Sequence, residues 1–381
     1  MDTERLQRAA REFALRPGLV YLNHAAVAPW PERTRRAVES FARENVAEGA
    51  LHYPRWLKVE ERLREGLARL INAPSSGDIA LLKNTSEGLS VVAWGLDWRQ
   101  GDNIVSSDEE FPSNRIVWES LRPRGVELRQ VPLRRHTDGP EEALMAAVDE
   151  NTRLLAVSSV QYASGLRLDL HKLGTYCRRR GILFCVDAIQ SVGALVTDVQ
   201  RDGIDFLMAD GHKWMLGPEG IALFYCRAEW RDRLQLHQYG WHMVEDAGAY
   251  DRREWQIAKT ARRFECGSPN MLGIHALEAS LSLLLEIGMD TVEKRVLENA
   301  RLLLDAIGGL ASYELLTDGT AGRHAGIVTF RHRSLSGESL FRYLSREGVV
   351  CALRGGGIRF SPHFYTSKPL LEHAVSLLEK L

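Results

Sequence analysis

Apolar and polar residues alternate along most of the chain in a pattern that predicts strands separated by helices. Short apolar runs bounded by glycine or aspartate are typical of buried strands, and apolar residues three or four positions apart are typical of helices. The runs predict strands at 102–108, 126–132, 153–160, 181–188, 205–211 and 220–226. Helical spacing occurs at 54–71, 85–95, 114–122, 140–149 and 170–180. This alternation predicts an α/β fold with a mostly parallel sheet flanked by helices.

The last third of the chain follows a different pattern. A less regular stretch at 228–268 precedes long helical patterns at about 271–287 and 289–309. Short strand patterns, interleaved with helical segments, then occur at 326–332, 348–354 and 357–362. We therefore expect a smaller C-terminal α+β domain at 269–381, packed with an N-terminal arm at 1–30, beside a large domain at 31–268.

Composition narrows the class of protein. The 381 residues are 45% hydrophobic, and 49 basic residues nearly balance 50 acidic ones, so nothing points to nucleic acid or a membrane surface as a partner. No apolar run approaches the ~18–20 residues that span a bilayer, and the charged amphipathic start is unlike a signal sequence. We expect a cytoplasmic protein.

The cysteines and histidines do not predict a metal site. The five cysteines include no CxxC pair, and the twelve histidines show no HExxH spacing, so we expect neither a disulfide framework nor a bound metal. Cys185 and Cys226 lie in apolar runs and are expected to be core residues.

One lysine stands between two predicted buried strands. Lys213 lies in "DGHKWMLGPEG", after the apolar run "DFLMA" and before "GIALFYC". An ordinary exposed loop lysine is one interpretation. In the other, partial burial lowers the pKa of the amine and makes it a nucleophile for carbonyl carbon.

Open α/β sheets bind ligands at the carboxyl ends of their strands, so residues that follow strands are candidates. Asp187 ends one predicted strand, with Gln190 three residues later. Asp187 either caps a helix or pairs with a cationic ring nitrogen. Since 213 − 187 = 26 residues separate it from Lys213, enough for a crossover and a strand, the two side chains can meet at one edge.

Other segments also have two interpretations. Thr85 and Ser86 start a helical pattern, where they cap the helix or, with Gly88 and free N–H groups, bind a phosphate. Phe111 follows a strand and is either packed or covers one face of a flat ring. The turn in "RFECGSPN" is a cap or a second phosphate contact.

Arg359 lies in the apolar run "GIRFSPHF", beside three glycines. It is either a surface arginine or a bidentate clamp for a carboxylate. A lysine nucleophile, a carboxylate for a ring nitrogen, a stacking aromatic, a phosphate cradle and a carboxylate clamp together describe a pyridoxal phosphate (PLP) site for an amino acid substrate.

The sequence resembles the class V aminotransferase group of fold-type I PLP enzymes, which includes cysteine desulfurases, isopenicillin N epimerase and kynureninase. The resemblance covers nearly the whole chain through "YLNHAAVAP", "NTSEGLS", "EFPSN", "VDAIQSVGA", "GHKWMLGPEGI", "FECGSPN" and "GIRFSPHFYTS". It implies the PLP-transferase fold, PLP as cofactor, an amino acid substrate and a homodimer with shared active sites.

The resemblance also implies roles for individual residues. Lys213 would bind the cofactor covalently, Asp187 would contact the pyridine nitrogen, and Gln190 would approach the ring hydroxyl. Phe111 would stack on the ring, and Arg359 would bind the substrate carboxylate. The phosphate would be held by Thr85, Ser86 and His212, and by Ser268 of the neighbouring subunit. Candidates for tuning the reaction at the substrate are His24, Gln161, Tyr239, Trp241 and His242, although packing is the more common role for each.

Two departures from the family pattern matter. Persulfide-forming desulfurases carry a cysteine just before the carboxylate-binding arginine, whereas the segment here is "RGGGIR" and Cys351 lies earlier. This argues against sulfur transfer through an enzyme persulfide. The second departure is Asp210, where desulfurases often have a serine that contacts phosphate. Because an acid beside a dianion is repelled, we expect Asp210 to point away or to pair with a cation.

The residues leave the reaction open. Transamination, epimerisation and loss of a β-substituent all use the same residues around the cofactor and the substrate. Transamination needs the fewest additional residues, so the sequence favours an aminotransferase, with an epimerase or a Cβ–S lyase as alternatives. A nucleotide-binding dehydrogenase would need GxGxxG after the first strand, which is absent. A non-catalytic protein of this fold would have no need for Lys213, Asp187 and Arg359 together.

Overall fold

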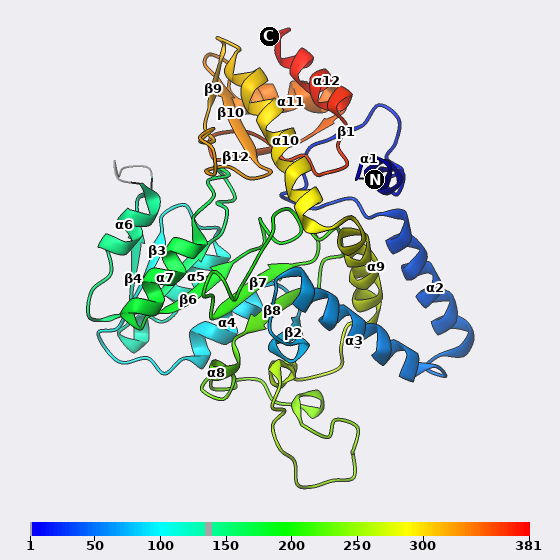
Figure 1. Cartoon of the computed structure of the whole chain (residues 1–381), viewed down its shortest axis with the longest axis vertical. Helices are drawn as coiled ribbons and strands as arrows, with labels where there is room; N and C mark the ends of the chain where they lie inside the picture. The colour runs from blue at the N-terminus through cyan, green and yellow to red at the C-terminus, as the bar shows by residue number, and fades with distance from the viewer. Residues whose placement is uncertain (1, 134–138) are drawn as a thin grey trace.

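The computed structural model describes residues 2–133 and 139–381. Within them, the largest sheet has seven strands in the order β2-β8-β7-β6-β5-β3-β4. Strands β3 to β7 pair in parallel, whereas β8 is antiparallel to both β7 and β2. The expected mostly parallel α/β sheet is therefore confirmed (Figure 1). The strands are β2 (Ile79–Leu82), β3 (Asn103–Ser107), β4 (Glu127–Val131), β5 (Thr152–Ser158), β6 (Leu183–Asp187), β7 (Phe206–Asp210) and β8 (Ala222–Cys226).

Helices cover both faces of this sheet because its strands are apolar on both sides. In β7, Phe206 and Met208 join a core with α4 and α5, whereas Leu207 and Ala209 join a second core with α3, α7 and α9. This alternation of period two is what a strand buried on both faces produces. The helices are α3 (Tyr53–Leu70), α4 (Thr85–Gly95), α5 (Ser113–Glu119), α6 (Pro140–Ala146), α7 (Leu170–Arg180) and α9 (Met271–Ile287).

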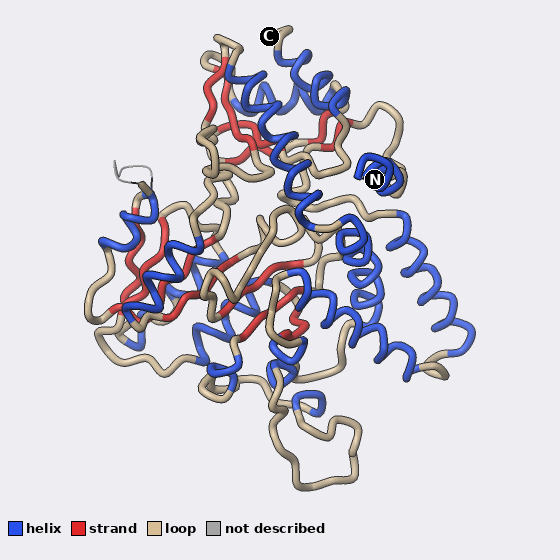
Figure 2. Tube along the Cα trace, viewed as in Figure 1, coloured by secondary structure: helices blue, strands red, loops and turns tan. Residues whose placement is uncertain are grey.

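The C-terminal part forms a smaller antiparallel sheet in the order β12-β13-β10-β9, which lies apart from the large sheet in Figure 2. Its apolar core includes side chains from α10, α11 and α12. Strand β1 (Val20–Tyr21) pairs in parallel with β11 (Val349–Val350), so an N-terminal segment packs against the C-terminal part of the chain. The remaining elements are α1 (Asp2–Ala10), α8 (Ala228–Arg231), α10 (Met289–Gly308), β9 (Tyr313–Leu315), β10 (Val328–His332), α11 (Gly337–Arg346), β12 (Ala352–Arg354), β13 (Gly357–Phe360) and α12 (Lys368–Leu378).

The structure adds elements that the sequence pattern did not predict. Helix α2 (Glu32–Glu48) has few apolar residues and packs mainly against α9. Strands β1, β2 and β9 have four residues or fewer, too short for periodicity to reveal. The predicted strand at 348–354 is divided into β11 and β12, which join different sheets. The domain boundaries stay a prediction.

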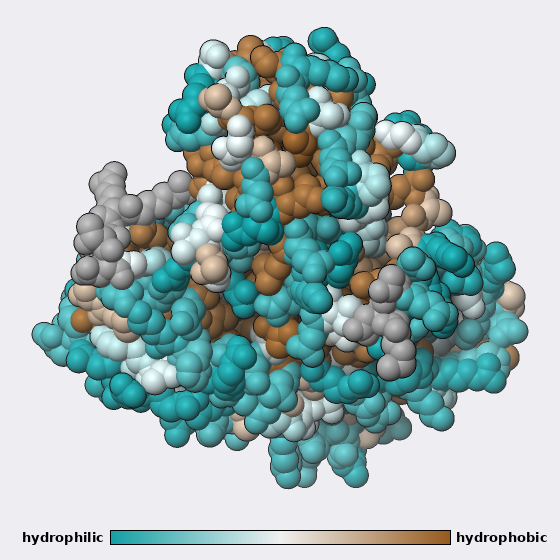
Figure 3. Space-filling model, turned by 45° about the horizontal axis from the view of Figure 1, so that its top comes forward, coloured by the Kyte–Doolittle hydropathy of each residue, from teal (hydrophilic) through white to brown (hydrophobic). Residues whose placement is uncertain are grey.

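The surface in Figure 3 is mostly hydrophilic, with apolar side chains showing in its upper part. In the described part of the chain, no helix alone is long and apolar enough to cross a membrane. Helices α9 and α10 meet that test only as a pair bent by 87°, and α9 contributes to the core of the large sheet.

Candidate active site

A cavity of about 250 Å³ lies at the carboxyl edge of the large sheet, facing β13 of the smaller sheet. Strands β6 and β7 end at this edge because parallel strands share one direction, and their last residues are Asp187 and Asp210. The cavity is lined by these predicted site residues: Thr85, Ser86, Phe111, Asp187, Gln190, His212, Lys213 and Arg359. Segments far apart in the sequence therefore meet at one place.

The turn after β7 fixes the position of Lys213. The N–H of Leu216 donates to the carbonyl of Lys213 over 3.1 Å, and Leu216 has φ +62°, a conformation that non-glycine residues rarely adopt. Trp214 is fully buried and donates from Nε1 to Oε1 of Gln190 over 2.9 Å. A strained backbone conformation persists only where the surrounding structure enforces it. Such conformations are common at functional sites.

Burial shifts the pKa values of Lys213 and Asp187 in opposite directions. Burial lowers the pKa of Lys213, Asp187 opposes this, and Arg359 adds to it. Burial raises the pKa of Asp187 against a hydrogen bond from the N–H of Ile189 (3.1 Å). A lowered lysine pKa favours the neutral, nucleophilic amine. A cationic group beside Asp187 would restore the ionised carboxylate.

The aromatic ring of Phe111 lies beside the amine of Lys213. Its ring centroid is 5.6 Å from Nζ of Lys213, and the ring packs edge-on against Tyr162 at 5.1 Å. Phe111 is 41% exposed and lines the cavity, so its ring is accessible to a ligand. Tyr162 is a lining residue that the sequence did not indicate.

The N-terminal end of α4 forms the other end of the cavity. The N-cap is Asn84 rather than Thr85 or Ser86, because its side chain accepts from the N–H of Glu87 over 2.9 Å. Capping by Asn84 leaves the hydroxyl of Thr85 available. A Cβ on Gly88 would lie 3.1 Å from Cβ of Met208, so this glycine allows α4 to approach β7 closely. The free N–H groups of a first helical turn attract anions.

The hydrogen bonds of the side chains that line the cavity provide a test of whether the site fits PLP. Four buried lining atoms, Thr85 Oγ1, Asp210 Oδ1, His212 Nδ1 and Arg359 Nε, have no hydrogen-bond partner among the described residues. Buried polar atoms without partners are uncommon, so several at one cavity indicate a polar ligand. A phosphate suits the α4 end, a cationic ring suits Asp187, and a carboxylate suits Arg359. The residues present therefore fit PLP with an amino acid.

Arg359 is 2% exposed on β13, and its Nη1 donates to the carbonyl of Tyr162 over 2.7 Å. Burial lowers the pKa of its guanidinium to about 10, and nearby Arg354 adds to this effect. Arg354 also lines the cavity, at the end of β12. Arg354 was not among the predicted site residues, although its place before three glycines at a strand end was a usable signal.

Some predicted residues lie elsewhere. His24 is fully buried, with its ring nitrogens 2.8 Å from the carbonyl of Ser361 and 2.6 Å from the hydroxyl of Tyr365. Gln161 is also buried and donates to Glu110 over 2.9 Å. Neither belongs to the described lining of the cavity. Ser268 is exposed and likewise outside the lining of its own subunit.

The hydrogen bond from Gln161 leads to a third residue that the sequence did not indicate, the buried Glu110. This carboxylate accepts hydrogen bonds from the N–H of Ser158 (2.9 Å), from Gln161 (2.9 Å) and from Asn114 (2.8 Å). These donors hold Glu110 directly before Phe111. Its negative charge also contributes to the raised pKa of Asp187.

Of the two alternatives expected for Asp210, the first, that it points away from the cavity, is wrong, and the second, that it pairs with a cation, stays a prediction. Asp210 shares the α4 side of β7 with Met208, and it is 8% exposed and lines the cavity. Its Oδ2 lies 3.9 Å from Nδ1 of His212. Burial lowers the pKa of His212 to about 4, so near pH 7 this ring is neutral and provides no cation.

A second polar cluster lies outside the cavity. Glu60, His242 and Glu265 bring possible ligand atoms within 4.8 Å of one another. Arg64 already donates to both carboxylates, with 2.7 Å between its Nη2 and Oε2 of Glu265, and its guanidinium occupies the place of a cation. The cluster is therefore an ion network that ties α3 to the segment around 242–265.

Comparisons with known proteins identify the family of the chain. The family model described as aminotransferase class V matches residues 20–365. A protein of Methanothermobacter thermautotrophicus named probable cysteine desulfurase is 30% identical, over 99% of this chain and 98% of its own. A Bacillus subtilis protein named uncharacterized aminotransferase YcbU is 30% identical, over 90% of this chain and 89% of its own.

Solved structures share the fold. The apo cysteine desulfurase of Thermococcus onnurineus NA1 has a TM-score of 0.87 at 24% identity, with 98% of this chain and 97% of that chain covered. The cystine C–S lyase C-DES in complex with its product cysteine persulfide has a TM-score of 0.87 at 23% identity, with 94% and 97% covered. A C-DES mutant with glycine covalently linked to the PLP cofactor has a TM-score of 0.88 at 22% identity, with 97% and 98% covered.

The position of Lys213 yields a direct prediction. Lys213→Ala should abolish the visible absorption band of covalently bound PLP and reduce turnover to the blank rate, because no other lining residue is an amine nucleophile in the described chain. Lys172→Ala, which removes a surface ion pair with Glu142, is the control and should keep both. Normal activity of Lys213→Ala would refute the assignment.

Proposed function

The chain belongs to the class V aminotransferase family, whose cofactor is PLP, and on this premise we propose that it is a Cβ–S lyase. It cleaves a cysteine-derived amino acid and releases the sulfur product without an enzyme-bound persulfide. The observation that carries this proposal is a cavity that combines Lys213, Asp187 and Arg359 in a chain whose relatives are named cysteine desulfurases.

The cysteines of the chain support release of sulfur to solution. Cys351 is 6% exposed, and burial raises the pKa of its thiol to about 12, so it is a poor sulfur acceptor. The turn between β12 and β13 consists of Gly355 and Gly356, both with positive φ. None of the described residues that line the cavity is a cysteine.

When bound, PLP supplies an electron sink for the electron pair left by a bond broken at the substrate's α-carbon. Arg359 binds the substrate carboxylate and sets which α-carbon bond faces Lys213. The neutral amine of Lys213 takes the α-proton. Asp187 places a negative charge beside the ring nitrogen, and Thr85, Ser86 and His212 with the first turn of α4 hold the phosphate.

Transamination is the second candidate, and it is the reaction that the sequence favours. It is supported by the Bacillus subtilis relative that is named an aminotransferase. The same residues serve both reactions: in transamination the proton taken from the α-carbon is returned elsewhere, and no bond to sulfur breaks. The products therefore distinguish the two candidates.

The test is a product analysis of the holoenzyme with L-cystine, L-cysteine and L-alanine, with and without an added 2-oxo acid. A Cβ–S lyase should convert cystine and water into pyruvate, ammonia and cysteine persulfide in equal amounts, and should not need the oxo acid. Amino transfer from alanine to the oxo acid, with cystine and cysteine unchanged, would replace the proposal with the second candidate.

The carboxylate clamp predicts a separate effect on substrate binding. Arg359→Ala should raise the KM for the amino acid about 10- to 100-fold, because a hydrogen bond to a charged group contributes about 1.5–3 kcal/mol. The Kd for PLP should stay unchanged. Arg331→Ala, which removes an exposed arginine of β10 paired with Glu314, is the control. An unchanged KM in Arg359→Ala for every substrate would exclude the clamp.

We also infer that the enzyme acts as a homodimer in which Ser268 completes the phosphate site of the neighbouring subunit. Ser268 lies outside the cavity of its own chain but follows the long loop at 239–256.

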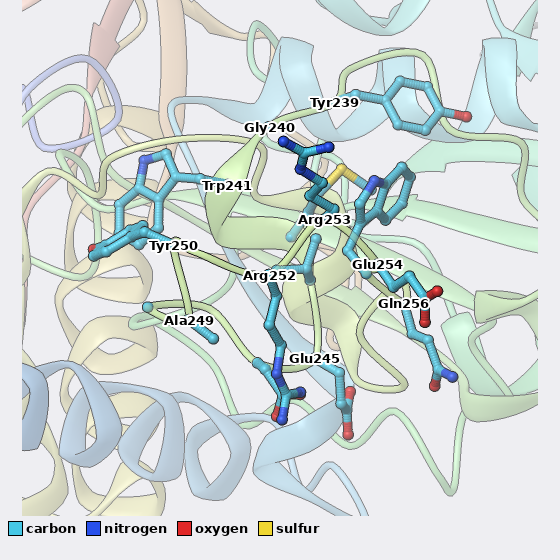
Figure 4. Close-up of a pocket in the computed structure, with 15 residues that line it drawn as sticks. Tyr239, Gly240, Trp241, Glu245, Ala249, Tyr250, Arg252, Arg253, Glu254 and Gln256 are labelled. Atoms are coloured by element: carbon cyan, nitrogen blue, oxygen red, sulfur yellow. The ribbon is translucent and has the colours of Figure 1, made fainter.

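The loop at 239–256 surrounds a cavity of about 1050 Å³. It carries several exposed aromatic residues, namely Tyr239, Trp241, Tyr250 and Trp255. Trp241 and Tyr250 lie together, with ring centroids 5.8 Å apart (Figure 4). Clustered exposed aromatic residues are typical of protein interfaces.

Mixed dimers test this inference. Dimers of Lys213→Ala and dimers of Ser268→Ala each have two defective sites. After subunit exchange, each mixed dimer should regain one site with tightly bound PLP, because Lys213 of one subunit meets Ser268 of the other. A monomer by sedimentation, or no recovery of tightly bound PLP in verified mixed dimers, would contradict the shared site.

A further inference from the structure

Asp210 lies where β7 meets the N-terminal end of α4. It is the last residue of β7, on the same side of the sheet as Met208, and Gly88 allows α4 to lie against this side. Asp210 is therefore buried and lines the cavity together with Thr85 and His212. Its placement in the cavity needs an explanation, because burying a carboxylate is costly and the nearby Lys213 offsets the effect of burial on its pKa only in part.

The same corner of the cavity attracts a phosphate. The first turn of α4 offers free N–H groups, and Oγ1 of Thr85 is buried without a hydrogen-bond partner in the described chain. Thr85 also lowers the pKa of Asp210, so the acid and the phosphate site share one neighbour. Two anions at this place would repel each other.

We propose that Asp210 is protonated when PLP is bound and that its carboxyl O–H donates a hydrogen bond to the phosphate. In this form the acid provides a donor where its ionised form would repel the ligand. Oδ1 of Asp210 has no partner within the part of the chain that the structure describes, so one carboxyl oxygen is free to face the ligand. The inference rests on PLP as the cofactor and does not depend on which reaction the enzyme catalyses.

The raised pKa of Asp210 also favours its protonated form. Burial raises the pKa of Asp210 to about 6, although Thr85 and Lys213 lower it, and a bound phosphate dianion would raise it further. The titratable and charged groups that line the cavity around it are Asp187, His212, Lys213, Glu219, Arg354 and Arg359. Because the pKa is higher in the bound state, affinity for the phosphate is greatest below the pKa of the free protein and falls as pH rises through the bound-state value.

Coenzyme binding to the apoprotein tests the proposal without any substrate. The Kd values of PLP and of pyridoxal, which lacks the phosphate, are measured at pH 6.0 and 8.5 for the wild type, Asp210→Asn and Asp210→Ala. The ratio of the two Kd values isolates the phosphate contribution and cancels effects on Lys213 and Asp187. Because the phosphate itself titrates near pH 6, Asp210→Asn, whose amide donates at every pH, provides the reference.

In the wild type, the preference for PLP should fall about tenfold more than in Asp210→Asn between the two pH values, as loss of one hydrogen bond to a charged group predicts. Asp210→Ala should have a preference about tenfold below that of Asp210→Asn at both. Glu372→Gln, which removes an exposed carboxyl group of α12 paired with Lys368 away from the cavity, should behave as the wild type. An unchanged Kd for pyridoxal in each variant shows that the fold is intact.

The opposite results would overturn the proposal. Equal pH dependence in the wild type and Asp210→Asn would show that Asp210 does not exchange a proton at this site. Tighter PLP binding by Asp210→Ala than by the wild type at pH 6.0 would show that the carboxyl group is ionised and repels the phosphate. Both readouts stay interpretable if the lyase proposal fails, because they involve the coenzyme alone.

Discussion

The burial of charged groups at the carboxyl edge of the large sheet is the constraint on which the rest of the structure depends. Lys213, Asp187 and Asp210 are held mostly out of water at the ends of β6 and β7. Removing charge from water is costly, so the pKa of the amine falls and those of the carboxyl groups rise. The site is therefore prepared for a ligand that carries both a cationic ring atom and an anionic phosphate.

The fold supplies this constraint by bringing three separate parts of the chain together. Parallel strands place their terminal acids at one edge, and Gly88 lets the positive end of α4 reach the same edge. The C-terminal sheet contributes Arg359 from β13, more than 140 residues after Lys213 in the sequence (359 − 213 = 146). The left-handed backbone of Leu216 and the buried Trp214 hold the lysine between these parts.

The relatives and the site constrain the chemistry to different degrees. Family membership and the lining residues agree on PLP, whereas the choice between breaking a bond to sulfur and transferring an amino group depends on how the substrate is oriented. Arg359 and Arg354 lie in the same cavity, where the proposed carboxylate clamp at Arg359 would set that orientation. Both arginines belong to strands of the C-terminal sheet, so this sheet contributes positive charge to a site whose other groups come from the large sheet.

The sequence by itself determined the alternation of strands and helices and the parallel sheet, and it singled out Lys213, Asp187 and Arg359, because apolar runs and the residues that end them are local patterns. It did not determine which polar side chains would be free. Thr85 is available only because Asn84 caps α4, and His24 is unavailable because Ser361 and Tyr365 engage it. Asp210 faces the cavity because α4 packs on its side of β7. Each of these outcomes depends on segments distant in sequence, whose contacts only the tertiary structure decides.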